Sequence, residues 1–146
     1  MELAMWKICA LLAAVFAAMT AILVKIGIDG INSNLATGIR TIVILILVWG
    51  IVLATVPLSE VKSLTAKNWT FLILSGIATG LSWMFYFYAI QIGPVSRVAP
   101  IDKLSVALTI FLAFVILGET VSWQVVVGGF LIVAGTLFML WDKTSL

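Results

Sequence analysis

The stretch LATGIRTIVILILVWGIVLATV, residues 35–56, decides the fold class because it is long, apolar and almost uncharged. Arg40 is its one charged residue, and Pro57 follows directly after it. A helix needs about 20 residues to cross the hydrocarbon core of a membrane, and this stretch is long enough to do so. It therefore predicts a membrane-spanning helix that carries one charge close to its beginning.

The whole chain has a similar composition. Of its 146 residues, 64% are hydrophobic and 10% are charged, and the mean hydropathy is +1.29. A water-soluble domain carries about 25% charged residues, so this chain has too few polar groups to cover its surface in water. The composition therefore predicts that the chain is embedded in a lipid bilayer. The net charge of +2, without a basic run, gives no indication of nucleic-acid binding.

Five apolar stretches are separated by short polar segments. Backbone polar groups in lipid must be satisfied within the structure, and the sequence lacks the alternating pattern of a membrane β-barrel. We therefore expect an all-α membrane protein with five transmembrane helices in a single domain, residues 1–146. Ser33 or Asn34 is expected to cap the second helix. The expected spans are 3–26, 35–56, 69–92, 95–117 and 123–140.

An odd number of spans places the two termini on opposite sides of the membrane. A second copy inserted upside down would give the inverted-repeat arrangement of many transporters. Positive residues set the orientation, and here they are nearly balanced between the two sides. This balance is what insertion in both orientations would need, and a single orientation set by other factors is the alternative. We expect one side of the membrane to carry Lys7, Lys62 and Lys67, and the other side to carry Lys25, Arg40, Arg97 and Lys143.

Several charged residues lie within the expected spans or at their ends. A charge at mid-span costs about 2.5–3.5 kcal/mol on insertion scales, so such residues usually face a protein interior or a water-filled cavity. At about 1.5 Å per residue, Arg40 lies roughly 8 Å into its span and Lys103 roughly 12–14 Å. Long side chains near helix ends can instead reach the interface, an alternative that suits Lys25 and Arg97 best. The candidate substrate-binding or coupling residues are Lys25, Arg40, Arg97, Asp102 and Lys103.

Asp102 is the one acidic member of this set. Adjacent residues on a helix point about 100° apart, so Asp102 and Lys103 are not expected to face one partner. We expect Asp102 to pair with Arg40 or Lys25 from another helix. The remaining charge is positive, and it favours a substrate that carries a carboxylate or a phosphate.

Pro100 lies among these charges in the segment SRVAPIDKLS, residues 96–105. It has no N–H to bond the carbonyl of Ser96, and its ring pushes on the preceding turn. We therefore expect residues 96–100 to be kinked or unwound, with Pro100 as a hinge. Irregular backbone at this depth is tolerated where protein or a water-filled cavity covers it. The segment is thus expected to form the floor of a polar cavity that opens to one face.

The aromatic run WMFYFY, residues 83–88, lies in the middle of the third span. Trp83 and Tyr86 are candidates for the wall of a substrate cavity, with the Tyr86 hydroxyl as a polar group. Simple packing or contact with lipid is the alternative for these rings. The glycine pair Gly128-Gly129 in the fifth span predicts close helix packing rather than chemistry.

The sequence has no groups suited to catalysis or to binding a cofactor. It contains no histidine and one cysteine, and it lacks a phosphate-binding loop and a pair of carboxylates at catalytic spacing. We therefore expect no enzymatic activity, no metal site and no cofactor.

Two parts of the sequence are similar to a known family. MTAILVKIGI, residues 19–28, followed by SNLATGIRT, residues 33–41, resembles the first two helices of the EamA-type drug/metabolite transporter superfamily. Residues 88–140, which include the sequence LGE at 117–119, resemble the last two helices of an EamA unit. The APIDKLS form resembles the five-span bacterial and archaeal branch, in which each polypeptide is one EamA unit. The positions that match family motifs are Lys25, Arg40, Asp102 and Lys103.

This resemblance implies a secondary transporter that exports a small metabolite by alternating access, and the excess of positive charge described above favours a polar or anionic one. It implies a homodimer, in an antiparallel arrangement, in the inner membrane of a prokaryotic cell. The partners would be a small-molecule substrate, the lipid bilayer and a second copy of the chain. The related four-span multidrug exporters use a glutamate in the first span, and residues 3–26 contain none. The alternative is a non-transporting membrane subunit or a protein that handles a lipid carrier.

Overall fold

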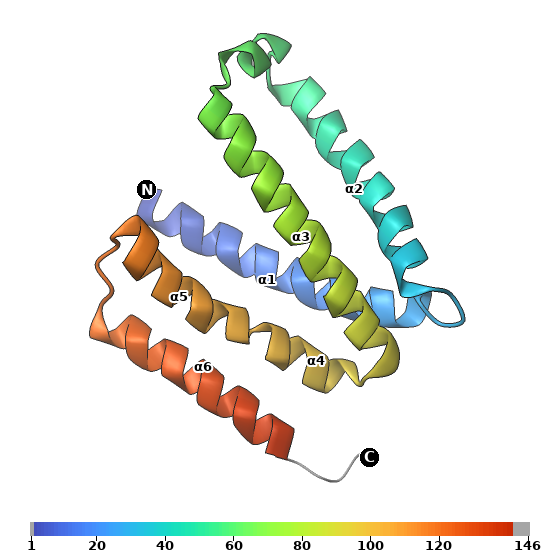
Figure 1. The fold of residues 1–146 in the computed structure, drawn as a ribbon, viewed down its shortest axis with the longest axis vertical. Coiled ribbons are helices and arrows are strands. Elements are labelled where there is room, and N and C mark those ends of the chain that lie inside the picture. The colour runs from blue at the N-terminus through green and yellow to red at the C-terminus, as the bar shows by residue number, and fades with distance from the viewer. Residues whose placement is uncertain (1, 142–146) are drawn as a thin grey trace. The chain divides into compact units, whose positions relative to one another are not determined.

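The computed structural model describes residues 2–141, and these form helices joined by short connections (Figure 1). Lys143 lies outside the described residues. No strand occurs within residues 2–141, and five helical segments are long and apolar enough to cross a membrane. The prediction of an all-α protein with five membrane-spanning helices is therefore confirmed. These segments are Met5–Gly27, Ser33–Thr55, Ala66–Ile92, Val95–Leu117 and Trp123–Trp141.

The helices form two packing units, the first ending at Ile92 and the second beginning at Gly93. The first unit contains α1 (Glu2–Gly27), α2 (Ser33–Thr55), the short 3-10 helix η1 (Leu58–Ser63) and α3 (Ala66–Ile92). The second unit contains α4 (Val95–Asp102), α5 (Leu104–Leu117) and α6 (Trp123–Trp141). The expected fourth span thus consists of two helices, α4 and α5.

The cap of α2 is Asn32, not Ser33 or Asn34 as expected from the sequence. Asn32 has an extended backbone, with φ −67° and ψ 131°, and its Oδ1 accepts a hydrogen bond from the Asn34 N–H at 2.8 Å. This bond satisfies one of the N–H groups at the helix start that have no partner within the helix. The helix can therefore begin at Ser33.

A reciprocal cap sets the beginning of α3 at Ala66, three residues before the expected start at Trp69. The Thr65 N–H donates to Asn68 Oδ1 at 3.0 Å, and the Asn68 N–H donates to Thr65 Oγ1 at 3.2 Å. Each side chain thus satisfies a backbone donor of the other residue, as in a capping box. The polar residues of the connection therefore serve as the first turn and cap of a helix.

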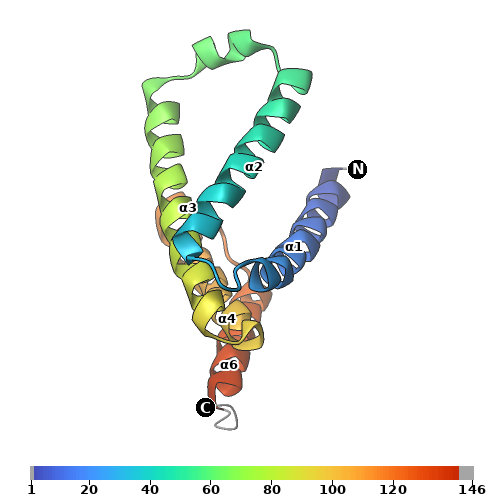
Figure 2. The ribbon, with the colours of Figure 1, turned by 90° about the vertical axis from the view of Figure 1, so that its right-hand side faces the viewer.

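Helix α3 contacts both α1 and α2 and is the central helix of the first unit. Figure 2 shows α2 and α3 close together where α2 begins and α3 ends, and further apart toward η1. The buried side chains of the unit lie at this closed end, where the C-terminal part of α1 also lies. They include Ala21, Val24, Ile28, Ala36, Phe87 and Ile90. The core of the unit therefore lies at the end that also carries Lys25, Arg40 and Gln91.

Helices α5 and α6 pack against each other in the second unit, and α4 also contacts α6. Gly118 ends α5 with φ 66°, a left-handed conformation that favours glycine. In α6, a Cβ built on Gly129 would lie 3.1 Å from Ile110 Cδ1, whereas one on Gly128 would have no neighbour within 4 Å. Of the two glycines, Gly129 is therefore the one that packs closely against α5.

The segment around Pro100 differs from the expectation. Residues 96–100 are neither unwound nor broken, because they lie within the helix α4, and the interruption lies three residues later, at Lys103. Proline has a φ close to that of a helix, so a short helix can hold it at the cost of one backbone bond. The interruption has tight turns, with Lys103 N bonded to Pro100 O and Val106 N bonded to Lys103 O, both at 3.0 Å.

Most large apolar side chains along the spans are exposed on the surface of the chain. They include Leu11 and Phe16 on α1, Ile46 on α2, Phe85 on α3 and Phe138 on α6. In water such a surface would be strongly unfavourable, whereas lipid tails are as apolar as these side chains. The exposure pattern is therefore that of helices that face a bilayer.

Candidate functional site

Lys25 connects the end of α1 to the end of α3. Its Nζ donates a hydrogen bond to the backbone carbonyl of Ile90 at 2.7 Å and lies 3.4 Å from the carbonyl of Gln91. These carbonyls belong to the last turn of α3, where backbone oxygens have no partner within the helix. A positive charge is also favourable at the negative end of a helix dipole. The Lys25 charge is thus directed toward the C-terminus of α3.

Gln91 makes the return connection, from α3 to the turn between α1 and α2. Its Nε2 donates to the carbonyl of Ile31 at 2.6 Å. A polar pocket of about 470 Å³ lies at this place, and its lining includes Lys25, Asp29, Gly30 and Gln91. The sequence reasoning missed Gln91. The available signal was a polar residue in an apolar helix, two positions before the Gly93-Pro94 terminator.

Arg40 lies at the same closed end of the first unit, in the second turn of α2. Its guanidinium carbon is 4.0 Å from the centre of the Phe87 ring on α3, which is the geometry of a cation–π contact. Its Nη1 is buried and has no hydrogen-bond partner in the described part of the chain. Phe87 itself is 2% exposed. The charge of Arg40 is therefore held against a buried aromatic ring with donors left unused.

Trp83 and Tyr86 surround the same ring. The Trp83 and Phe87 ring centres are 6.4 Å apart, and those of Tyr86 and Phe87 are 5.4 Å apart in an edge-to-face arrangement. Edge-to-face pairs at this separation are favourable beyond their buried area. The two candidate residues thus position Phe87, the residue that contacts Arg40. Whether they contact a substrate stays a prediction.

A second pocket of about 410 Å³ lies beside Arg40, between α1 and α2. Thr20 and Arg40 are the polar side chains of its lining, and the other lining residues, which include Val24 and Ala36, are apolar or glycine. Its volume is in the range of small-molecule sites, which are mostly apolar with a few polar groups that fix orientation. The pocket can therefore hold a small molecule that is mainly apolar and carries one charged group.

In the second unit, Asp102 is paired with its neighbour. Lys103 Nζ lies 3.1 Å from Asp102 Oδ2. This contact joins the two side chains to each other, and the expectation that they do not both face one common partner stays a prediction. A pairing of Asp102 with Arg40 or Lys25, which belong to the other unit, stays a prediction.

Two hydroxyl groups satisfy backbone carbonyls at the interruption between α4 and α5. Thr136 Oγ1 on α6 lies 3.2 Å from the carbonyl of Pro100, and it also bonds the carbonyl of Ile132 on its own helix at 2.8 Å. Ser105 Oγ donates to the carbonyl of Asp102 at 2.6 Å. The carbonyls that were expected to line a cavity are therefore bonded in part by the protein itself. Thr136 was missed because sequence spacing does not show which residue of α6 faces Pro100.

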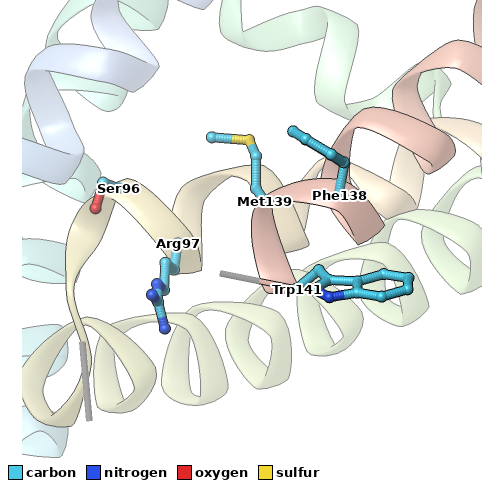
Figure 3. Close-up of a pocket in the computed structure, with 5 residues that line it drawn as sticks. All are labelled: Ser96, Arg97, Phe138, Met139 and Trp141. Carbon is cyan, nitrogen blue, oxygen red and sulfur yellow. The ribbon is translucent and has the colours of Figure 1, made fainter. Parts of the chain in front are cut away.

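Arg97 lies near a different pocket, of about 680 Å³, at one end of the second unit. The other lining residues are Ser96 on α4 and Phe138, Met139 and Trp141 on α6. Figure 3 shows the Arg97 side chain directed away from Phe138 and Met139. The polar groups of this pocket do not converge on one point, and a role of Arg97 in substrate binding stays a prediction.

Within the described residues, no group of three or more histidine, cysteine, aspartate or glutamate side chains is placed to hold a metal ion. Among the candidate charged residues, the described polar contacts include those of Lys25 with the Ile90 and Gln91 carbonyls, the Arg40–Phe87 contact and the Asp102–Lys103 pair.

Comparisons with known proteins place the chain among transporters. It matches the EamA-like transporter family over residues 4–141. A protein of Sinorhizobium sp, described as an uncharacterized transporter in the cobO 3' region, is 43% identical over 134 residues, which cover 92% of this chain and 95% of that protein. No solved structure is detectably similar to this chain.

Proposed function

Because this chain belongs to the EamA-like transporter family, we propose that it is a secondary transporter that exports a small polar or anionic metabolite. Family membership and the Sinorhizobium transporter identify a membrane transporter, and the five apolar helices identify an integral membrane protein. The substrate class and the direction of transport are part of the proposal. The proposed location is the inner membrane of a prokaryotic cell.

The observation that carries the proposal is the polar end of the first unit. Lys25, Arg40 and Gln91 lie at the closed end of three helices whose middle parts expose mainly apolar side chains. Ionisable groups inside a membrane are costly and usually serve a substrate or ion pathway. An excess of positive over negative groups at this end supports an anionic substrate over a cationic one.

We propose that the working form is a homodimer, antiparallel in the membrane. Five spans give each copy termini on opposite sides, and two copies of opposite orientation would form an inverted repeat that alternates access to a shared pathway. Two reporters fused to the C-terminus test whether both orientations occur. One reporter is active only inside the cell, and the other is active only outside it. Activity of both reporters supports two orientations. Activity of one reporter alone excludes the antiparallel dimer and leaves transport to be tested by itself.

Asp102 is the proposed coupling group if transport is driven by protons. It is the acidic residue within the membrane-spanning helix pair α4–α5, and it is paired with Lys103 at 3.1 Å. Uptake by purified protein in liposomes, with and without an imposed pH gradient, tests this role. The variant Asp102→Asn is expected to lose the response to the gradient, and an unchanged response would remove Asp102 from coupling.

Counterflow in liposomes tests the transport proposal as a whole. Liposomes with the purified protein are loaded with an unlabelled solute, and entry of the same labelled solute is measured over a panel of amino acids, hydroxy acids and organic phosphates. At least one solute should enter faster than it enters protein-free liposomes. Equal rates across the panel, with co-purification of another membrane protein, would favour a non-transporting subunit.

A further inference from the structure

We propose that Arg40 and the adjacent pocket between α1 and α2 form a binding site for small organic monoanions, specifically carboxylates with an apolar body. The inference rests on the proposed transport function in one respect, that the site is used on the transport path.

Lys25 and Lys103 are candidate cations with polar partners among the described residues. Lys25 donates to the carbonyls at the end of α3, and Lys103 is paired with Asp102. A cation that already has partners gains less from an added anion, because its existing bonds must first be broken. These residues are therefore poor candidates for the primary anion contact.

Arg40 differs from them. A guanidinium has five N–H donors in a rigid fork. Within residues 2–141, the guanidinium carbon of Arg40 lies 4.0 Å from the centre of the Phe87 ring, and its buried Nη1 forms no hydrogen bond. Its position is seven residues after Ser33, roughly 10 Å along α2 at 1.5 Å per residue. A charged group with unused donors at this depth is costly, and an anion in contact with it removes much of that cost.

The guanidinium is also held in place for such an anion. Phe87 is 2% exposed, and the rings of Trp83 and Tyr86 pack around it. A guanidinium held against a fixed ring by a cation–π contact keeps N–H donors that can meet two oxygens of a carboxylate at once. Because Nη1 is covered in this conformation, binding requires a small rotation of the side chain toward the pocket.

The lining of the pocket selects the rest of the ligand. Thr20 and Arg40 are its polar side chains, and its other walls are apolar in about 410 Å³. A carboxylate monoanion can have both oxygens satisfied by the guanidinium while its hydrocarbon part contacts apolar walls. Inorganic phosphate, as a monoanion or a dianion, would bring further polar groups that this lining cannot bond and no apolar part to contact the walls. The chemistry therefore favours a carboxylate with an apolar body over inorganic phosphate.

The test measures binding by the purified, full-length protein at pH 7, with protein-free micelles as the reference for partitioning. The probes are 4-methylpentanoate, its neutral counterpart 4-methylpentanamide, and inorganic phosphate. Wild-type protein should bind the carboxylate at least ten-fold more tightly than the amide or phosphate. Equal binding of acid and amide, no binding of the acid, or tighter binding of phosphate would each overturn the proposal without any variant.

Two variants locate the site. Arg40→Gln should weaken carboxylate binding about ten- to hundred-fold, the effect of losing a charge-assisted bond, and leave the amide unchanged. Gly27→Leu places a side chain in the pocket lining at a position where a Cβ meets nothing within 4 Å, so it should fold and weaken both probes. Lys62→Gln on the exposed helix η1 should change neither. Carboxylate binding that survives Arg40→Gln would refute the assignment.

The source of the anion is tested in nanodiscs. Carboxylate binding should persist in discs of phosphatidylcholine that also contain phosphatidylglycerol, and its loss there would assign Arg40 to a lipid phosphate. Arg40-dependent binding without counterflow of any solute would refute transport and keep the binding site. Counterflow that is unaffected by Arg40→Gln would keep transport and refute the role of the site.

Discussion

Replacement of Lys25 by methionine removes the contact that joins α1 to the end of α3. Methionine keeps most of the length of the side chain and its apolar stem, so the change removes the charge and the donors with little loss of packing. After the change, the carbonyl of Ile90 has lost the Nζ donor that lies 2.7 Å away. This carbonyl is in the last turn of α3, where the helix itself supplies no partner.

The expected loss follows from two contributions. A hydrogen bond to a charged group contributes about 1.5–3 kcal/mol, and a cation at a helix C-terminus contributes about 0.3–1 kcal/mol. The contact to Gln91 is 3.4 Å long and adds little. Because Lys25 is only partly buried, values near the low end of these ranges apply, and the free energy of unfolding should fall by about 2 kcal/mol. This corresponds to about a 30-fold change in the unfolding equilibrium.

Unfolding of the purified protein by sodium dodecyl sulfate, followed by circular dichroism, measures this loss. The matched control is Lys67→Met, the same change in the exposed first turn of α3. A positive charge is unfavourable at the start of a helix, so this control should lie within about 0.5 kcal/mol of wild type or slightly above it. Equal stability of the Lys25 and Lys67 variants would refute the assignment of Lys25 as the cap of α3.

Two further predictions concern the second unit, both measured by the same unfolding assay. Gly129→Leu should destabilise the protein by about 1–3 kcal/mol more than Gly128→Leu, because a Cβ on Gly129 lies 3.1 Å from Ile110 Cδ1 and one on Gly128 is unobstructed. Equal effects of the two leucines would contradict the α5–α6 packing. Thr136→Val keeps the side-chain shape and removes the bond to the carbonyl of Pro100, so it should cost about 1 kcal/mol. A variant as stable as wild type would show that this hydroxyl does not hold α6 to α4.

The sequence predicts the helices well because length and apolar composition alone determine a membrane span. The helix boundaries depend on local side-chain bonds, and there the prediction is less exact. Asn32 caps α2 in place of its two polar neighbours, and Thr65 and Asn68 start α3 three residues early. Several polar residues compete for each cap, and which one succeeds depends on the backbone angles of the turn.

For the candidate site, the sequence identifies the charged residues but not their partners. The charges of Arg40 and Lys25 were found from the sequence because a charge in an apolar span is exceptional. Their partners were not found, since the Ile90 carbonyl and the Phe87 ring are ordinary features of α3 that become partners through packing. The Asp102–Lys103 contact was not found either, because Asp102 was expected to pair with a cation from another helix. Tertiary contacts therefore decide what each charge does.

Counterflow by wild-type protein and by Arg40→Gln, over a panel of membrane-impermeant amino acids and hydroxy acids, tests the central claim most directly. We expect wild-type liposomes to take up at least one carboxylate solute faster than protein-free liposomes do, and Arg40→Gln to lower that rate about ten-fold or more. Wild-type rates equal to those of protein-free liposomes for every solute would contradict the account.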